Sequence, residues 1–190
     1  KHVGTFGNIG ILSFNGNKII TTGGGGMILA KNSNHFNLAR HLTTVAKQKN
    51  KFFIGHDMMG YNYKLPNTNA ALGCAQIKKI RRLIQLKRQL SKKYISELIN
   101  IPEVEVLKEK KGSRSNYWLN TIILKGDNYK NRDQIISEAH KNNIFVRPAW
   151  KCLSQNKYLK NFPKMNLKNT INLQKRILNL PSSPHLISKI

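Results

Sequence analysis

The sequence predicts an α/β protein in two parts that a long helix connects, and three observations lead to this prediction. An apolar run, a glycine run and a second apolar run near the start are typical of two short strands joined by a turn. Residues 67–99 keep an apolar stripe at helical spacing for about nine turns. Two strand patterns, a helix, a short strand and a closing helix follow, which is the order of a small α+β domain.

In the first part, we expect strands at 9–14 (IGILSF) and 27–30 (MILA), with the glycines as the turn between them. A helix is expected over FNLARHLTTVAKQ, with Asn34 as its N-cap. The loop after it ends at Pro66 and is rich in aromatic residues and glycine. Loops of this length inside a compact domain are usually functional or disordered, and the aromatic content argues against disorder.

In the second part, the patterns predict three strands and two helices around a basic turn, KEKKGSRS. The change of character along the long helix places the domain boundary near Arg88. The expected domains are therefore 1–88 and 89–190. The expected strands are 104–107, 116–124 and 144–148, and the expected helices are 131–142 and a last one near 167–178.

Composition limits the functions that need to be considered. No apolar run in the 190 residues reaches the roughly 18 residues that a membrane-spanning helix requires, so no membrane partner is expected. Cys74 and Cys152 lie outside any CxxC or histidine-rich cluster, which argues against a disulfide framework and against a metal site. A reduced, cytoplasmic protein is expected.

The net charge of +25 invites a comparison with nucleic-acid-binding proteins. However, lysines are spread from Lys1 to Lys189 and arginines are few, whereas specific binders cluster their charge or favour arginine. The residue bias of an AT-rich coding sequence explains the excess better than a dedicated nucleic-acid face. A basic nucleic-acid-binding module therefore stays the alternative from another class of function, and an anionic substrate is compatible with either.

The stretch SFNGNKIITTGGGG places one lysine, Lys18, between a strand pattern and four glycines. Taken alone, Lys18 is a solvated lysine beside a hairpin bend. Ser13 changes this interpretation, because a hydroxyl and nearby backbone N–H groups at the end of a strand can receive a phosphate. An amine that loses its proton can form a Schiff base, and glycines let the backbone pack close to a cofactor.

Two motifs in this order, SFNGNKIITTGGGGMIL and GYNYKLPNTNAALGCAQIKKI, resemble the DegT/DnrJ/EryC1/StrS family of sugar aminotransferases, which use pyridoxal 5'-phosphate. The resemblance is strongest to the branch that aminates UDP-4-keto-6-deoxy-N-acetylhexosamines for bacillosamine and legionaminic acid type sugars. The later RPAW and LPSSPHL segments resemble the same branch. This implies the C-terminal part of a fold-type I transferase: the end of the large α/β domain and the small α+β domain.

The resemblance also implies roles for individual residues. Lys18 matches the family lysine that forms the Schiff base with the cofactor and later moves a proton as general acid and base. Ser13 matches the serine that hydrogen-bonds the cofactor phosphate. Asn62 resembles the asparagine that reaches the phosphate in the neighbouring subunit, so a homodimer with shared active sites is implied.

Three further residues are matched to the substrate. Lys64 stands where this branch more often has arginine, and it loses the bidentate fork that arginine offers an anion. Arg147 and Trp150 match a segment near the sugar nucleotide. Each residue also has a plainer role open to it, such as a surface ion pair for Arg147 or core filling for Trp150.

The implied reaction moves an amino group, with glutamate as donor, to a UDP-linked 4-keto sugar. Same-family sugar dehydratases carry histidine in place of the lysine, so Lys18 favours amine transfer. The aspartate that holds the cofactor's pyridine nitrogen is expected before residue 1, and the chain alone is therefore expected to be a truncated, inactive part. His56 and Asp57 lack a nucleophile motif beside them, which argues against a hydrolase.

Overall fold

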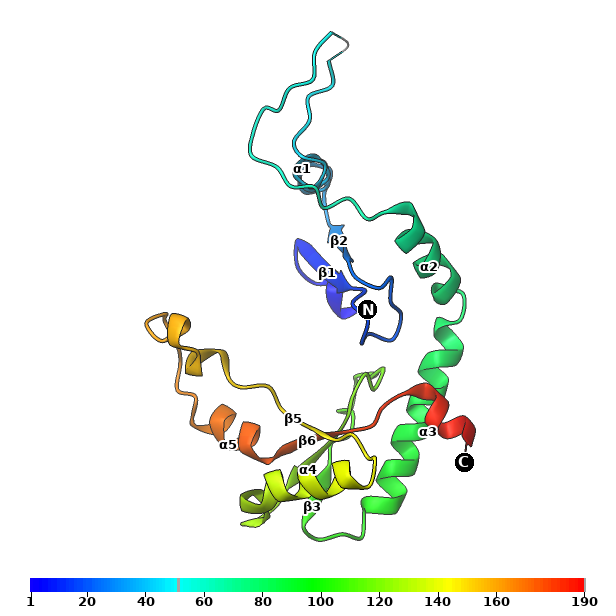
Figure 1. Cartoon of the computed structure of the whole chain (residues 1–190), viewed down its shortest axis with the longest axis vertical. Helices are drawn as coiled ribbons and strands as arrows, with labels where there is room; N and C mark the ends of the chain where they lie inside the picture. Colours follow the sequence, from blue (N-terminus) through cyan, green and yellow to red (C-terminus); the bar gives the residue numbers. More distant parts are fainter. Residues whose placement is uncertain (51, 190) are drawn as a thin grey trace. The chain divides into compact units, whose positions relative to one another are not determined.

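The computed structural model describes residues 1–50 and 52–189. The chain divides into two compact units, Lys1–Arg81 and Arg82–Ile190 (Figure 1). The boundary predicted after Arg88 lies farther along the same helix, α3 (Ile80–Leu98). The two units are described separately below.

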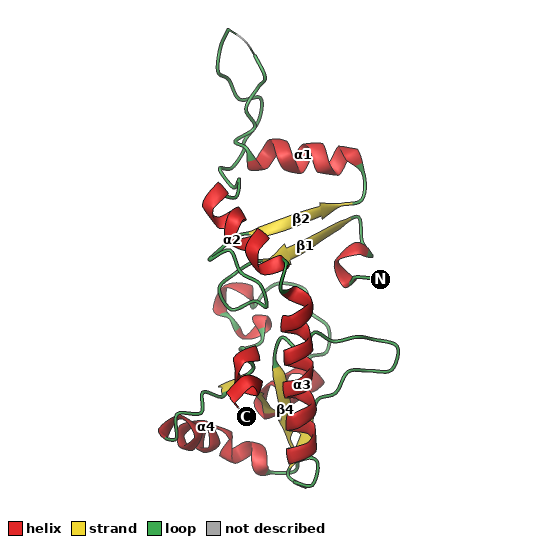
Figure 2. Cartoon of the chain, turned by 90° about the vertical axis from the view of Figure 1, so that its right-hand side faces the viewer, coloured by secondary structure: helices red, strands yellow, loops and turns green. Residues whose placement is uncertain are grey.

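The first unit is built on an antiparallel pair of strands, β1 (Ile9–Ser13) and β2 (Gly26–Ala30). Their register runs from Ile9 opposite Ala30 to Ser13 opposite Gly26. Helix α1 (Ser33–Thr43) follows β2 and lies beside the strand pair (Figure 2). Both strands predicted for this part are confirmed, and the segment that contains Lys18 is the connection between them.

Helix α1 differs from the prediction at both ends. Its N-cap is Asn32, whose side chain accepts a hydrogen bond from the amide three residues later, so the prediction of Asn34 as the cap was wrong. The helix ends at Thr43 because Val45 and Ala46 have φ angles of 60° and 49°, which a right-handed helix does not accommodate. The segment after Thr43 therefore belongs to the loop.

The long helix predicted over 67–99 is two helices, α2 (Asn67–Ile77) and α3, so the prediction of one continuous helix was wrong. The chain turns at Lys78 and Lys79, where the Lys79 N–H donates to the carbonyl of Gln76 at 2.9 Å. This hydrogen bond joins residues three apart, as in a 3₁₀ turn, so the backbone is wound more tightly here than in an α-helix. The apolar stripe continues on both sides of the break, which is why periodicity does not reveal it.

The second unit contains a four-stranded antiparallel sheet in the order β3-β4-β6-β5. Its core consists of Ile122, Leu124 and Leu178, and Leu178 is only 1% exposed. The strands are β3 (Val104–Val106), β4 (Asn120–Leu124), β5 (Arg147–Pro148) and β6 (Ile177–Leu180), and the helices are α4 (Arg132–Lys141) and α5 (Lys168–Arg176).

Three predictions for this unit need correction. The last helix ends at Arg176, and the apolar residues after it form β6, a central strand rather than the end of a helix. Strand β4 begins at Asn120 instead of residue 116, because Tyr117 has a φ of 45° and breaks the extended backbone. The strand predicted over 144–148 is limited to Arg147 and Pro148.

Short 3₁₀ turns complete the described chain, and they are η1 (Val3–Thr5), η2 (Asn128–Asn131), η3 (Leu153–Gln155), η4 (Lys157–Leu159) and η5 (Pro184–Lys189). Within the described residues, no helix has both the length and the apolar character needed to cross a membrane. The same residues contain no group of three or more His, Cys, Asp or Glu side chains placed to hold a metal ion.

Candidate functional site

The connection between β1 and β2 is a closed loop. The Phe14 N–H donates to the carbonyl of Gly25 at 3.0 Å, and the Thr22 N–H donates to the carbonyl of Phe14 at 3.0 Å. The two ends of the loop are thereby tied together, as in an Ω-loop. Lys18 lies between these ties, on a turn in which its N–H donates to the carbonyl of Asn15 at 3.0 Å.

Ser13 directly precedes this loop, and Lys18 lies within it. Ser13 is the last residue of β1, and its exposed hydroxyl accepts a hydrogen bond of 3.4 Å from the Asn15 N–H. Lys18 is half-buried. The end of β1 and the loop after it thus carry a hydroxyl that suits a phosphate oxygen and a primary amine that suits an aldehyde.

Helix α2 holds the far arm of this loop through two side chains. Gln76 accepts from the Thr21 N–H at 2.9 Å, and Asn69 donates to the carbonyl of Thr22 at 2.6 Å. Gly73 lets the helix approach, since a Cβ there would lie 2.8 Å from the Thr22 methyl carbon. The sequence did not predict that these three residues support the loop. Their place in the second family motif was the one feature that could have pointed to them.

The glycine run makes room beside the loop. Gly23 and Gly25 have φ angles of 80° and 106°, which favour glycine, and a Cβ added at Gly24 meets nothing within 4 Å. The backbone at Gly24 is therefore open to an approaching group, whereas a Cβ at Gly25 would lie 2.7 Å from a side-chain carbon of Leu65. The amine, the hydroxyl and this open backbone fit pyridoxal phosphate.

Asn62 and Lys64 lie on the segment that returns from the long loop to α2. The Tyr61 N–H donates to the carbonyl of Leu42 at 2.7 Å, and the Tyr63 N–H donates to the carbonyl of Thr43 at 3.0 Å. These bonds fasten the segment to the end of α1. Asn62 itself pairs with Thr44 as an isolated β-bridge, and the side chains of Asn62 and Lys64 are exposed.

The tyrosines around Asn62 stack with ring centres 5.2 Å apart. Since alternate residues of an extended segment point to opposite sides, Tyr61 and Tyr63 share one side and Asn62 faces the other. The backbone bonds fix the backbone at Asn62 and therefore the side of the segment from which its side chain leaves. Its exposure leaves the amide accessible to a ligand or to another chain.

His56 and Asp57 of the long loop each make a structural hydrogen bond. Asp57 accepts from His41 of α1 at 2.6 Å, and this bond holds the pKa of the Asp57 carboxyl below its usual range. His56 bonds the carbonyl of Val45 at 2.7 Å. His56 and Asp57 thus have different partners.

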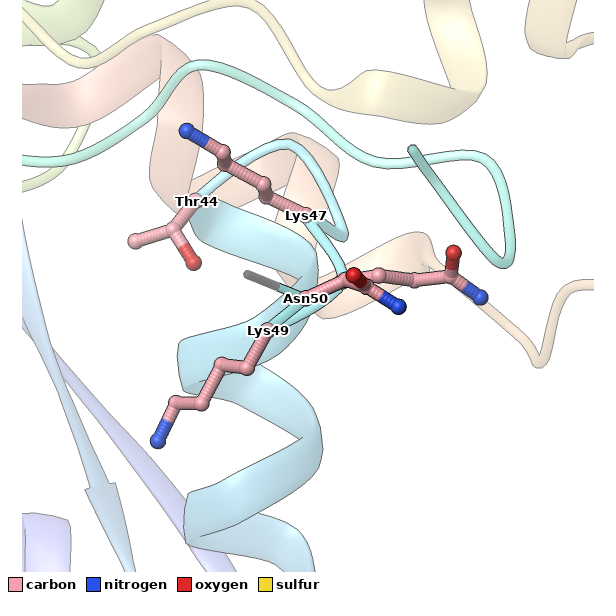
Figure 3. A pocket seen from close by; sticks show the side chains of 5 residues that line it. Thr44, Lys47, Lys49 and Asn50 are labelled. Carbon is pink, nitrogen blue, oxygen red and sulfur yellow. The ribbon is translucent and has the colours of Figure 1, made fainter. Parts of the chain in front are cut away.

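An open hollow of about 450 Å³ lies on the segment after α1 (Figure 3). It is lined by Thr44, Lys47, Gln48, Lys49 and Asn50, and the figure shows Lys47 and Lys49 extending away from the backbone in different directions. None of the predicted site residues lines it. The Lys18 loop, rather than this hollow, is the chemically distinctive site of the first unit.

In the second unit, Arg147 and Trp150 lie on and just after β5. Arg147 is exposed and pairs in register with Asn179 of β6. Trp150 is 79% exposed, and its ring centre lies 6.4 Å from that of Trp118, with the planes tilted by 48°. The exposed Trp150 lies beside the half-buried Trp118, so Trp150 does not fill the core.

The loop that leads to Trp118 is fixed by an ion pair. Arg88 donates to both carboxylate oxygens of Glu109, at 2.9 and 2.7 Å, and to the Ser115 carbonyl at 2.7 Å. Glu109 also accepts from the Ser115 N–H at 2.7 Å. The hydrogen bonds from Arg88 and the Ser115 amide lower the pKa of Glu109 to about 2. These hydrogen bonds hold the backbone at Ser115, which precedes Trp118 in the chain.

Lys87 is a buried cation with a structural partner. It is 4% exposed, and its amine donates to the carbonyl of Ser182 at 2.5 Å. Burial lowers the pKa of this amine below its usual range. The Tyr94 hydroxyl similarly donates to the carbonyl of Pro181 at 3.0 Å. Both side chains fasten the segment after β6 to α3.

A lysine on a closed loop with a glycine-rich arm, followed by a small α+β unit, defines the C-terminal part of a fold-type I pyridoxal-phosphate-dependent transferase. The chain belongs to the DegT/DnrJ/EryC1/StrS aminotransferase family, whose profile matches residues 1–189. Pyridoxal phosphate is the cofactor of the homologues in this family. The resemblance inferred from the two motifs is thereby confirmed.

The relatives support this assignment along the whole chain. GDP-perosamine synthase of Vibrio cholerae is 34% identical over 189 residues, which are 98% of this chain and 50% of that protein. The putative pyridoxal phosphate-dependent aminotransferase EpsN of Bacillus subtilis is 37% identical over 153 residues, which are 80% of this chain and 39% of that protein. The chain therefore spans about half the length of the curated relatives that it matches.

A solved structure shows the same fold. Helicobacter pylori PseC, an aminotransferase involved in the biosynthesis of pseudoaminic acid, superposes with a TM-score of 0.91 at 23% identity. The match covers 100% of this chain and 53% of PseC. The prediction of an α/β chain corresponding to the C-terminal part of this fold is thus confirmed.

Proposed function

We propose that the protein carrying this chain moves an amino group from glutamate to a nucleotide-linked 4-keto-6-deoxy sugar. The observation that carries the proposal is the Lys18 loop, in which an amine lies on a closed loop, a hydroxyl lies at the end of the strand that enters it, and the backbone at Gly24 is open. Membership of an aminotransferase family supports the same chemistry. The family's dehydratases replace this lysine by histidine, so Lys18 favours amine transfer.

Pyridoxal phosphate, when bound, supplies the electron sink that makes the substrate carbon acidic. Lys18 would hold the cofactor through its amine at the aldehyde carbon, and it would also carry a proton to or from the substrate carbon. Ser13 would donate a hydrogen bond from its hydroxyl to a phosphate oxygen. The ties at Phe14 and Thr22 close the loop that carries Lys18 directly after Ser13.

Asn62 serves a site shared between two copies of the chain. Its side chain is exposed on a backbone that the bridge to Thr44 fastens, which suits a group that reaches the cofactor phosphate of a partner subunit. A homodimer is therefore part of the proposal. A polypeptide without the carboxylate that holds the cofactor's pyridine nitrogen is expected to bind the cofactor weakly and to turn over slowly or not at all.

For the acceptor we propose a UDP-linked 4-keto-6-deoxy-N-acetylhexosamine. In the first unit Lys64 is an exposed cation that suits an anionic group of the substrate. In the second unit Arg147 is likewise an exposed cation, and the exposed Trp150 offers an aromatic face to a base or a sugar. The similarity to GDP-perosamine synthase supports a nucleotide sugar and makes a GDP-linked 4-keto sugar the competing acceptor.

The test uses the full-length polypeptide with pyridoxal phosphate. A yellow absorption should appear, and borohydride reduction should fix the label on Lys18, as located by peptide mapping. Assays with glutamate then compare UDP-linked with GDP-linked 4-keto-6-deoxy sugars. A label spread over surface lysines would contradict the enzyme assignment, whereas turnover of the GDP-linked sugar alone would contradict only the acceptor.

A further inference from the structure

Side-chain amides of α2 bind the far arm of the Lys18 loop. Thr22 is 3% exposed, while Asn69 and Gln76 are half-buried. They bind consecutive peptide groups of the arm, Gln76 at the Thr21 N–H and Asn69 at the Thr22 carbonyl. Two amides seven residues apart, about two helical turns, thus reach neighbouring peptide groups.

The direction of each hydrogen bond follows from its backbone partner. A peptide N–H only donates, so the Gln76 atom that faces Thr21 is the carbonyl oxygen. A peptide carbonyl only accepts, so the Asn69 atom that faces Thr22 is the amide nitrogen. Gln76 therefore acts as an acceptor and Asn69 as a donor, and replacing each amide by the corresponding acid affects them differently.

We propose that Asn69 and Gln76 are positioning residues that fix the Lys18 loop and so set where the Lys18 amine meets the cofactor. The inference rests on the proposed function for the role of Lys18. The arm they hold begins three residues after Lys18, and the Thr21 hydroxyl and the Thr22 N–H also tie this arm to the Phe14 carbonyl. Loss of the α2 contacts weakens the hold on the backbone between Phe14 and Thr22.

The geometry of the arm shows how the hold is transmitted. The Thr21 hydroxyl donates to the Phe14 carbonyl at 2.9 Å and accepts from the Gly23 N–H at 2.9 Å. Thr21 therefore links the α2 contact both to the start of the loop and to the glycine run. Because catalysis depends on placing reacting groups within about an ångström, a loosened arm lowers the fraction of molecules with Lys18 in position.

The test compares two isosteric variants, Asn69→Asp and Gln76→Glu, in the full-length polypeptide. Both add one negative charge to α2. The aspartate loses the donor that binds the Thr22 carbonyl, whereas the glutamate keeps an acceptor for the Thr21 N–H. We expect Asn69→Asp to lose the hold on the loop and Gln76→Glu to retain it.

If Asn69 and Gln76 served only to stabilise α2, the two variants would rank in the opposite order. Residue 69 lies in the first turn of α2, where a negative charge stabilises the helix dipole, and residue 76 lies in the last turn, where it destabilises. A role for α2 limited to its own folding would thus favour Asn69→Asp over Gln76→Glu. The two explanations are separated by the sign of the difference between the variants.

Two readouts measure the hold. Hydrogen exchange of the loop amides between Phe14 and Gly25 should be faster by about tenfold in Asn69→Asp, as expected for the loss of one hydrogen bond to a buried group, and within about twofold of the parent in Gln76→Glu. The rate at which pyridoxal phosphate is captured by Lys18, followed by the yellow absorption, should fall by about tenfold in the first variant alone.

Gln76→Leu and Asn69→Leu complete the set and guard against misfolding, which circular dichroism checks. Both should speed loop exchange, because each removes its polar group. Unchanged loop exchange in Asn69→Asp and in both leucine variants would overturn the proposal. A label absent from Lys18 in the parent would overturn the proposed function instead, and the exchange data would still decide whether α2 holds the loop.

Discussion

The two units of the chain differ in the interactions that stabilise each of them internally. Among the described residues, the buried hydrophobic side chains of the second unit are Leu90, Ile122, Leu124, Val146 and Leu178, whereas Ala46 is the buried hydrophobic residue of the first. In the first unit, where little apolar surface is buried, hydrogen bonds between side chains and backbone, as at Asn69 and Gln76, hold the Lys18 loop. Its strands keep exposed apolar residues, including Ile11 at 67%.

This difference predicts that function and stability depend on different residues. Geometry that depends on a few hydrogen bonds can be altered locally, whereas a packed core responds to any lost volume. Substitutions in the Lys18 loop should therefore change chemistry with little effect on unfolding. Substitutions in the sheet of the second unit should do the reverse. The predictions below test this contrast, from the largest expected effect to the smallest.

Replacing Lys18 by alanine should have the largest effect, a fall in the transamination rate of at least about 10²- to 10⁴-fold, because the proton-transferring amine is lost. The yellow absorption and the borohydride-fixed label should disappear as well. Lys31, an exposed lysine just after β2, supplies the matched control as Lys31→Ala. Equal loss of activity in both variants would remove the special status of Lys18.

Replacing Leu178 by alanine should destabilise the second unit by about 2–5 kcal/mol, because the side chain is 1% exposed and its removal leaves a cavity. Urea unfolding measures the change. Leu173→Ala is the control, since this α5 residue is 43% exposed and should cost much less. The borohydride label of the folded variant should stay on Lys18. A shift of the label would show that the two units are not separable in this way.

Replacing Ser13 by alanine should weaken the affinity for pyridoxal phosphate by about ten- to a hundredfold, since one hydrogen bond to a charged phosphate is removed. Titration of the yellow absorption gives the Kd. The free energy of unfolding should not change, because the Ser13 hydroxyl is exposed and its hydrogen bond from the Asn15 N–H is long, at 3.4 Å. A Kd equal to that of the parent would assign the phosphate to other groups.

Local pattern was enough to predict much of this molecule. The strands around the glycine run follow from short apolar segments and turn residues, and Lys18 follows from the motif between them. The break at Lys78 was invisible because the apolar stripe continues through it. Strand β6 was mistaken for helix because Ile177–Leu180 extends an amphipathic helix, and only its partners in the sheet make it a strand.

The supports of the site were the hardest part to predict. Gln76 bonds a residue 55 positions away, and Asn69 bonds one 47 positions away. Nothing in the residues near Lys18 indicates which helix will lie against the loop. Arg88 and Glu109 present the same difficulty in the second unit, where the pair is 21 positions apart. Motifs identify groups that carry chemistry, whereas their supports depend on tertiary contacts.

The Arg88–Glu109 pair supplies the smallest expected effect. The pKa of Glu109 is about 2 in the folded protein and 4.5 ordinarily, so the unfolded state binds its proton first as the pH falls. The pair's contribution is fully present above about pH 4.5 and is lost as the pH falls towards about 2. The side chain is 26% exposed, and solvent therefore screens the gain.

Unfolding midpoints of the parent and of Glu109→Gln, measured from pH 6 down to about 2, should converge as the acid end is approached. Glu105→Gln is the control, because Glu105 is an exposed residue of β3 and should leave the pH profile unchanged. A parallel offset between parent and Glu109→Gln at every pH would mean that the hydrogen bonds of Glu109 matter but its charge does not. The packed sheet would then stabilise the second unit with no electrostatic help from this loop, and the contrast between the two units would become sharper.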